Sequence, residues 1–171
     1  MNRSSTTKKA AIPTLACATI AGMLILSGCG TSIREYRANG NSMLPLLASG
    51  DRIFVDVSDK ARSNLHDGDV VVFRHKDSLI VKRILAMPGE TISGDHGKVI
   101  RDGKQIDEPY LAPANADNHL ATFPARTLGA GEIFVAGDKR DLSSDSRLTA
   151  YGPVYVSDVI GKYSWTYWHT K

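Results

Sequence analysis

The sequence predicts a mainly β protein preceded by one apolar N-terminal segment. The 171 residues fit one domain plus a tail, and a hydrophobic content of 42% is enough to form a core. From residue 52 onward, short runs rich in β-branched and aromatic residues are separated by Gly, Asp and Pro, the pattern of strands and turns. Outside the N-terminal segment no stretch has a helical period. We therefore expect short antiparallel strands folded into a β-barrel or sandwich.

Residues 1–30 form the first expected unit, a signal or anchor segment. Arg3, Lys8 and Lys9 precede residues 10–33, which contain no charged residue. A basic start followed by an apolar run places the N-terminus in the cytoplasm and the rest of the chain outside it. We therefore expect a membrane-anchored protein whose following domain lies on the extracytoplasmic side, periplasmic or outer.

The apolar segment is open to two interpretations. As an uncleaved anchor it is long enough to cross a bilayer, which needs about 20 residues. As a lipoprotein signal it ends in Leu26-Ser27-Gly28-Cys29, which is similar to the lipobox whose cysteine is acylated. We favour the second interpretation, with lipidation at Cys29. Because the other cysteine, Cys17, lies inside the segment, the exported domain has no pair that could form a disulfide.

Residues 31–39 follow as a short polar linker, and residues 40–171 as the β domain. Strands are expected at 53–57, 70–74, 79–85, 98–101, 105–106, 133–136 and 162–168. Asp102-Gly103 is a hairpin signal between two of them. The region around 95–130 is expected to hold a short accessory hairpin or loops, because 110–128 is the least patterned part of the chain.

The last expected strand is rich in aromatic residues. Tyr163, Trp165 and Tyr167 alternate with other residues, so we expect them to share one face. Two roles remain open for that face. It packs as a final strand against the barrel, or it forms an aromatic belt on lipid headgroups.

Ser42 opens the stretch around which the site is expected. Residues 41–47 are polar at the start and apolar through the middle, and Pro45 prevents a regular helix from beginning at the serine. We interpret this as a serine at the mouth of an apolar groove. A serine becomes a nucleophile only when a partner activates it.

Lys82 is the candidate partner, because it lies within the strongly apolar run 78–85. Two interpretations are open. The lysine extends its stem along the sheet and keeps its ammonium in water, or burial lowers its pKa and the neutral amine takes the serine proton. Arg83 is expected on the opposite face of the same strand, so one of the two side chains faces inward.

Four motifs occur in order along the chain. They are Ser42-Met43-x-Pro45 with Gly50-Asp51, Gly68-Asp69 with the following Val70–Phe73, Val81-Lys82-Arg83 with Met87–Glu90, and Gly137-Asp138 through Arg147. Together they resemble the ordered boxes of the bacterial type I signal (leader) peptidases, serine endopeptidases with a Ser/Lys dyad. The resemblance implies a signal-peptidase-like β fold and a membrane-attached enzyme that cleaves signal peptides from exported preproteins.

The resemblance also implies roles in the site. Ser42 would be the nucleophile and Lys82 the base, since no His-x-Asp arrangement accompanies the serine. The backbone N–H of Ser42 would be one oxyanion donor. In the family a second donor is often a hydroxyl two residues before the nucleophile. That position is Gly40 here, so the second donor is unassigned.

The last motif would support the dyad. By the same resemblance, the Ser143 hydroxyl orients the lysine amine, and Asp145 and Arg147 hold the loop. Asp138 and Arg140 belong to the same supporting set. The motif departs from the usual family form at Lys139 and Leu142, where asparagines are common.

Substrate preference is expected to follow from apolar walls. The family match places six residues around shallow pockets for the first and third positions before the cut: Tyr36, Ala38, Met43, Leu47, Ile80 and Val81. Such pockets reject bulky side chains by steric clash. The implied substrates are preprotein signal peptides with Ala-x-Ala-like sites.

Several classes are excluded or kept as alternatives. The net charge of +3 is small and the basic residues are scattered, so we expect no nucleic-acid partner. The five histidines never have metal-ligand spacing, so no metal and no cofactor are expected. We expect a monomer that contacts membrane lipid. The alternatives are a processing peptidase dedicated to a secretion or conjugation client such as a pilin, and a non-catalytic peptide-binding lipoprotein.

Overall fold

The computed structural model describes residues 32–113 and 122–170. These residues belong to one compact unit, Thr31–Lys171. The expected signal or anchor segment, residues 1–30 with Cys29, lies outside the described residues. Among the described residues, none of the helices has both the length and the apolar character needed to cross a membrane.

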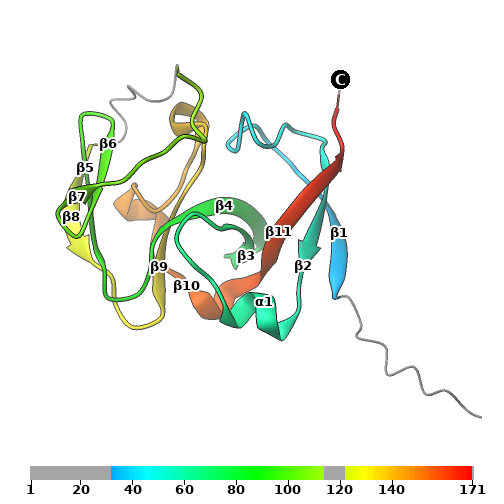
Figure 1. Ribbon diagram of the computed structural model, residues 1–171, viewed down its shortest axis with the longest axis horizontal. Coiled ribbons are helices and arrows are strands. Elements are labelled where there is room, and N and C mark those ends of the chain that lie inside the picture. Colours follow the sequence, from blue (N-terminus) through cyan, green and yellow to red (C-terminus); the bar gives the residue numbers. More distant parts are fainter. Residues whose placement is uncertain (1–31, 114–121, 171) are drawn as a thin grey trace, which may run out of the picture. The chain divides into compact units, whose positions relative to one another are not determined.

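The expected mainly β class is confirmed, because the described residues form two antiparallel sheets (Figure 1). The larger sheet has seven strands in the order β1 (Ile33–Arg37), β2 (Arg52–Asp56), β11 (Val159–Trp168), β3 (Val70–His75), β4 (Ser78–Ala86), β9 (Glu132–Ala136) and β10 (Val154–Tyr155). The smaller sheet has four strands in the order β7 (Lys104–Gln105), β6 (Lys98–Arg101), β5 (Thr91–Asp95) and β8 (Phe123–Thr127).

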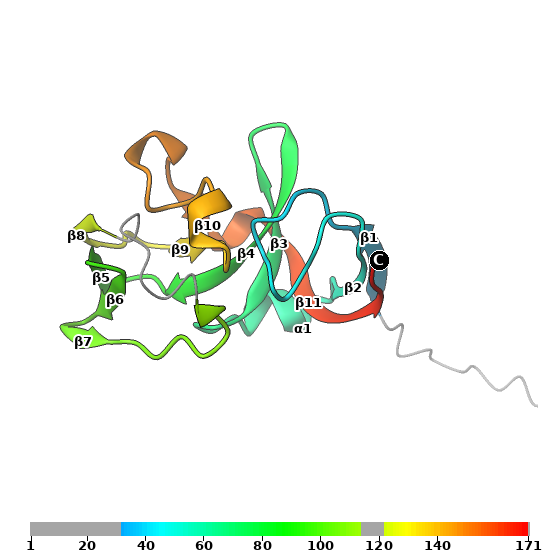
Figure 2. The ribbon, with the colours of Figure 1, turned by 90° about the horizontal axis from the view of Figure 1, so that it is seen from above.

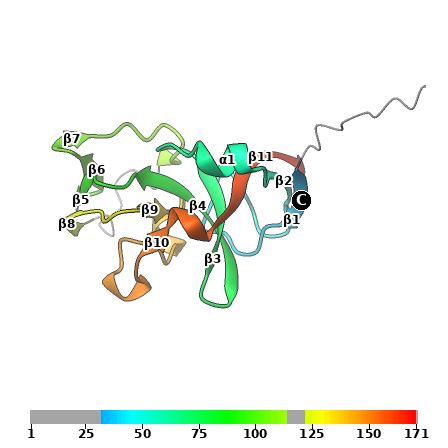
Figure 3. The same ribbon diagram turned by 90° about the horizontal axis from the view of Figure 1, so that it is seen from below.

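Short helical turns connect the strands. Helix α1 (Asp59–Ser63) lies beside β11 (Figure 3) and begins where the Ser58 side chain accepts a hydrogen bond from the N–H of Ala61. The other turns are η2 (Arg140–Leu142), η3 (Thr149–Tyr151) and η4 (Val156–Asp158). These elements are too short to show a hydrophobic period, so the sequence pattern did not predict them.

Three clusters of buried side chains form the core. The first lies on β3, β4 and β9. The second joins β9 to the smaller sheet, where Phe123 stacks on Phe134 with ring centroids 5.1 Å apart. The third contains Met43, Leu47 and Ile53 and therefore connects the segment after Ser42 to the larger sheet. Burial of these apolar side chains is the main favourable contribution to the fold.

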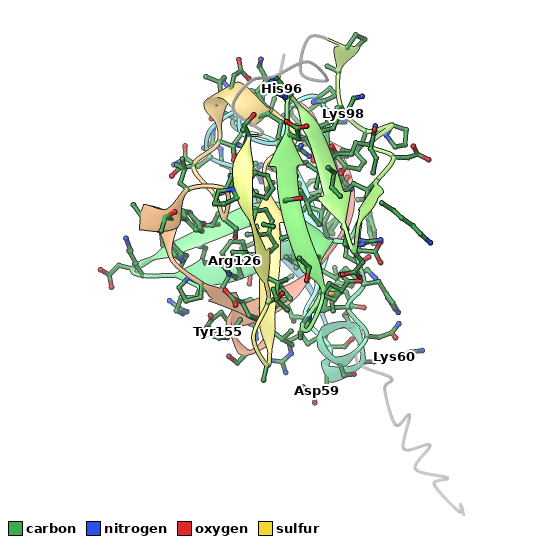
Figure 4. All side chains as sticks on the ribbon, turned by 90° about the vertical axis from the view of Figure 1, so that its left-hand side faces the viewer. Asp59, Lys60, His96, Lys98, Arg126 and Tyr155 are labelled. Carbon is green, nitrogen blue, oxygen red and sulfur yellow. The ribbon has the colours of Figure 1, made fainter. Side chains whose placement is uncertain are left out.

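Four strands occur where the sequence predicted none, namely β1, β5, β8 and the two-residue strand β10. Strand β1 lies within the expected linker 31–39, and β5 and β8 lie in or beside the accessory region. Strand β1 is an edge strand with three charged residues, β5 contains Gly94, and β8 is an edge strand that contains Pro124. Glycine and proline weaken a strand pattern, and edge strands tolerate both proline and charge. Figure 4 faces the smaller sheet, with Lys98 on β6 and Arg126 on β8.

The expected common face of Tyr163, Trp165 and Tyr167 is wrong. The pairing of β11 with β2 shifts register between Tyr163 and Trp165, and such a bulge reverses the side to which the following residues point. Tyr163 packs against the core. Trp165 and Tyr167 instead contact Phe54, with ring centroids 5.0 and 4.5 Å away.

Candidate active site

Ser42 lies in the loop that leaves the sheet after β1 and returns at β2. The loop is closed at its base, because the N–H of Ala38 donates to Asp51 O and the N–H of Gly50 donates to Ala38 O, both at 2.8 Å. Met43 and Leu47 anchor it, each only 1% exposed in the third core cluster. These buried anchors leave Ser42 half-buried at the start of the loop.

Lys82 reaches the serine from the sheet. It lies in the middle of β4, opposite Val71 of β3, and is 4% exposed. Its Nζ atom is 2.6 Å from Ser42 Oγ. Arg83 extends elsewhere, to the carboxylate of Asp138 and the carbonyl of Gly68, as expected from strand alternation. The structure therefore brings together the two side chains that the sequence singled out.

The protonation of Lys82 is shifted toward the neutral amine. Burial lowers the pKa of Lys82, because the charged form loses its hydration. The Asp145 charge acts in the opposite direction, Arg147 lowers the pKa further, and Asp138 raises it. Burial outweighs the acidic neighbours, so the pKa lies below that of an ordinary lysine.

Asp145 organises the last motif. It is fully buried and accepts hydrogen bonds from Ser143 Oγ at 2.5 Å, Gly137 N–H at 3.0 Å and Arg147 Nε at 2.7 Å. Burial raises the pKa of Asp145, but the Arg147 pair and the Ser143 and Gly137 donors outweigh it, and the pKa lies below its usual value. The Ser143 hydroxyl donates to Asp145, and the hydrogen bond that the described residues give Lys82 Nζ goes to Ser42 Oγ, so the expected direct role of Ser143 in orienting the lysine amine stays a prediction.

The two other supporting residues also form buried ion pairs. Asp138 accepts from Arg83 Nε at 2.9 Å and Nη2 at 2.7 Å. Arg140, 1% exposed, donates from Nε to Gly137 O at 3.0 Å and pairs with Glu108. Such charges are stable inside a protein only when paired. Sequence reasoning had missed Glu108, which lies in an unpatterned stretch and carries no motif.

Gly137 lies where the last motif packs against the serine loop. The N–H of Lys139 donates to Ser42 O at 2.9 Å, which holds the two segments together. A Cβ atom on Gly137 would overlap both the Ser42 carbonyl oxygen and the Ser143 hydroxyl. Only glycine fits there, which explains the glycine of this motif in physical terms.

A pocket of about 150 Å³ adjoins the serine and the lysine. Both side chains line it, together with apolar residues that include Tyr36, Ala38, Ile53, Val72, Ile80 and Val81. Arg37 and Asn39 also line it, although the family match had not assigned them. Met43 and Leu47, which were also expected at the substrate pockets, do not line this pocket and are buried in the third core cluster as loop anchors.

Gly40 adopts φ of 89°, a backbone conformation that favours glycine. Its N–H donates to Ser49 Oγ at 3.2 Å, and a Cβ atom there would meet no atom within 4 Å. A side chain would thus be strained by backbone conformation and not by crowding. The position supplies no hydroxyl to the site.

Comparisons with known proteins agree on one family. The family model described as "Signal peptidase, peptidase S26" matches residues 11–168. Signal peptidase IB of Staphylococcus aureus is 31% identical over 151 residues, covering 80% of this chain and 78% of that protein. Signal peptidase I S of Bacillus subtilis is 37% identical over 119 residues, covering 66% and 65%. A crystal structure of a signal peptidase I from Enterococcus faecalis matches with a TM-score of 0.50 and 27% identity, over 58% of this chain and 96% of that one.

Proposed function

This chain belongs to the signal peptidase family, peptidase S26, and from that premise we propose that it is a membrane-attached serine endopeptidase with a Ser42–Lys82 dyad. Its reaction would be the cleavage of signal peptides from exported preproteins. The observation that carries the proposal is the 2.6 Å separation of Ser42 Oγ and Lys82 Nζ beside an apolar pocket. The lowered pKa of Lys82 supports it, because only the neutral amine can accept a proton.

In the proposed reaction, Ser42 Oγ attacks the scissile carbonyl carbon while its proton passes to Lys82 Nζ. The resulting oxyanion accepts a hydrogen bond from the backbone N–H of Ser42. The C–N bond then breaks, and the Lys82 ammonium returns the proton to the leaving amine. The neutral Lys82 amine then takes a proton from water, which attacks the acyl carbon; the bond to Ser42 Oγ breaks, and the Lys82 ammonium returns its proton to that oxygen. Because Gly40 offers no hydroxyl, a water molecule or another backbone group would supply the second oxyanion donor.

The proposed supporting residues act on the dyad through position and charge. Asp145 carries the charge that most favours protonated Lys82, and it is itself neutralised by Arg147. Asp138 and Arg140 fix the loop that follows Gly137. We assign these residues to the geometry of the site and not to bond making.

We propose small side chains at the first and third positions before the cut, as in Ala-x-Ala sites. The support is the small pocket volume and the apolar walls from β1 and β4, including Tyr36, Ala38, Ile80 and Val81. A pocket of this kind gains little free energy from any one methylene and excludes larger groups by steric clash. Preprotein signal peptides are the substrates of this proposal.

We place the domain on the extracytoplasmic side of a membrane. The basic start of the chain and the apolar run 10–33 support this topology. Trp165, Tyr167 and Trp168 add a second support, because each is at least 40% exposed and aromatic side chains favour the headgroup region. Lipidation at Cys29 is part of the proposal.

Cleavage of a purified preprotein tests the proposed mechanism. Ser42→Ala and Lys82→Ala are each expected to abolish processing, while Lys76→Ala, which changes an exposed lysine in the β3–β4 turn, keeps wild-type activity. Undiminished processing by either dyad variant would refute the mechanism. A wild-type protein that neither cleaves preproteins nor is acylated by a penem inhibitor would instead favour the peptide-binding lipoprotein.

A further inference from the structure

Ser49 closes the loop that carries Ser42. Its hydroxyl oxygen accepts a hydrogen bond from the N–H of Gly40 at 3.2 Å, and its own N–H donates to Asn41 Oδ1 at 3.0 Å. Both partners directly precede the serine. The position of Ser49 therefore helps to set the direction in which the chain enters Ser42, although each of these bonds is exposed and weak by itself.

Asp51, two residues later, is a buried carboxylate, 1% exposed. Within the loop it accepts from the N–H of Ala48 at 2.9 Å. Its other contacts come from beyond the last strand, namely Thr170 N–H at 2.8 Å, Thr170 Oγ1 at 3.2 Å and His169 Nδ1 at 3.2 Å. A carboxylate so deeply buried depends on such donors. They outweigh burial and hold the pKa of Asp51 below its ordinary value.

Thr170 also contacts the loop directly. Its hydroxyl lies 3.1 Å from Ser49 O, so its one proton is shared between that carbonyl and Asp51. The side chain covers Gly50, where a Cβ atom would come within 2.7 Å of Thr170 Oγ1. The absence of a side chain at Gly50 therefore allows Thr170 to contact the loop.

The sheet register explains how this contact arises. Strand β11 pairs antiparallel with β2, and Trp168 lies opposite Arg52. Continuing the pairing by two residues brings His169 and Thr170 alongside Asp51 and Gly50. In Figures 1 and 2 the end of β11 and the loop after β1 lie at the same side of the larger sheet.

We infer that His169 and Thr170 are positioning residues for the nucleophile, with Thr170 as the main contact. Thr170 holds Ser49 and Asp51, and Ser49 holds the two residues before Ser42. The segment after β11 thereby fixes the serine loop over Lys82 without touching substrate. This inference rests on the proposed function, in which Ser42 is the nucleophile.

Thr170→Val tests the inference, because it keeps the shape and the backbone N–H and removes only the hydroxyl. We expect kcat for a preprotein to fall about 3- to 10-fold, the rate equivalent of one hydrogen bond, with KM unchanged. Thr170→Ser restores the hydroxyl and is expected to restore kcat. Thr166→Val is the matched control, because that hydroxyl, on β11 four residues earlier, pairs with Tyr163 and not with the serine loop.

Hydrogen exchange provides a second readout that does not depend on turnover. In Thr170→Val the N–H groups of Gly40 and Ser49 are expected to exchange about 3- to 10-fold faster, while those of β3 and β4 keep wild-type rates. Wild-type kcat and exchange in Thr170→Val would overturn the inference. So would an equal loss of kcat in Thr166→Val, which would indicate a general effect on β11. If the wild type cleaved the preprotein and Ser42→Ala cleaved it equally fast, the proposed function of Ser42 would be refuted instead.

Discussion

The buried Lys82 gives this site its chemistry, and its burial destabilises the folded protein. Lys82 is 4% exposed, and its nearest oxygen acceptor is a neutral hydroxyl and not a carboxylate. Asp145 and Asp138 favour its charged form, but they are already paired with Arg147 and Arg83. The lysine is therefore held with a lowered pKa by burial that its neighbours offset only in part.

We predict that Lys82→Met stabilises the folded protein at neutral pH. The unfolded chain binds a proton at position 82 up to the ordinary lysine pKa, and the folded chain releases it at lower pH. Stability therefore rises with pH between the folded and the unfolded pKa, and the wild type is weakest below this window. Each unit of pKa depression is worth about 1.4 kcal/mol. Methionine removes this cost at similar volume.

Thermal unfolding of Lys82→Met and wild type, at neutral pH and near pH 10.5, measures this effect. The variant is expected to have the higher Tm at neutral pH, and the difference is expected to shrink at the higher pH. Lys76→Met, at an exposed position, serves as the control. A variant less stable than the wild type at neutral pH would show that burial of Lys82 carries no such cost.

Two elements meet at one glycine to assemble the site. The serine loop is anchored by Met43 and Leu47, whereas the last motif is held by Asp145 and Arg147. Their contact is the Lys139 N–H to Ser42 O hydrogen bond beside Gly137. A Cβ atom on Gly137 would overlap the Ser42 carbonyl oxygen and the Ser143 side chain, so an added atom there must displace one of the two elements.

We predict that Gly137→Ala misplaces the nucleophile. The added methyl overlaps the Ser42 carbonyl oxygen, so the loop must shift, and a shift of about 1 Å can reduce the rate about 100-fold. The packing strain is expected to lower the free energy of unfolding by about 1–3 kcal/mol. Preprotein turnover and chemical denaturation measure the two effects.

Gly129→Ala is the matched control for that substitution. Its Cβ atom would make only an ordinary contact, 3.6 Å from the Glu132 side chain, so turnover should stay near the wild-type rate. If Gly137→Ala also kept wild-type turnover, the close contact at Gly137 would have no part in placing Ser42.

At the scale of the whole molecule, the five inner strands of the larger sheet and strands β6 and β7 of the smaller sheet were predictable, whereas the edge strands β1 and β10 and strands β5 and β8 were not. Strands β3 and β4 contain the consecutive buried apolar runs Val70–Phe73 and Ile84–Ala86, so their composition predicts strands. Strands β5 and β8 are short and carry Gly94 and Pro124, so their pairing depends on contacts distant in sequence. The bulges of β11 could not be predicted from the sequence either, because the alternation of side chains assumes a regular strand register.

The site shows the same division. The pairing of Lys82 with Ser42 was predicted only through the resemblance to the signal peptidases, because the sequence pattern alone left open whether the lysine is buried or keeps its ammonium in water. Predicting Glu108 as the partner of Arg140, or Thr170 as a contact of the serine loop, would have required the tertiary structure. Met43 and Leu47 were assigned to the pocket because sequence does not reveal which side of a loop faces the core.

The protonation of Lys82 is the most direct test of the account, because the proposed mechanism requires a neutral amine beside Ser42. With lysine labelled by 13C and 15N in the solubilised full-length protein, an NMR titration follows each side chain, and the signal missing from Lys82→Met identifies position 82. We predict that this signal titrates clearly below the ordinary lysine value of about 10.4. A midpoint at or above that value would contradict the account.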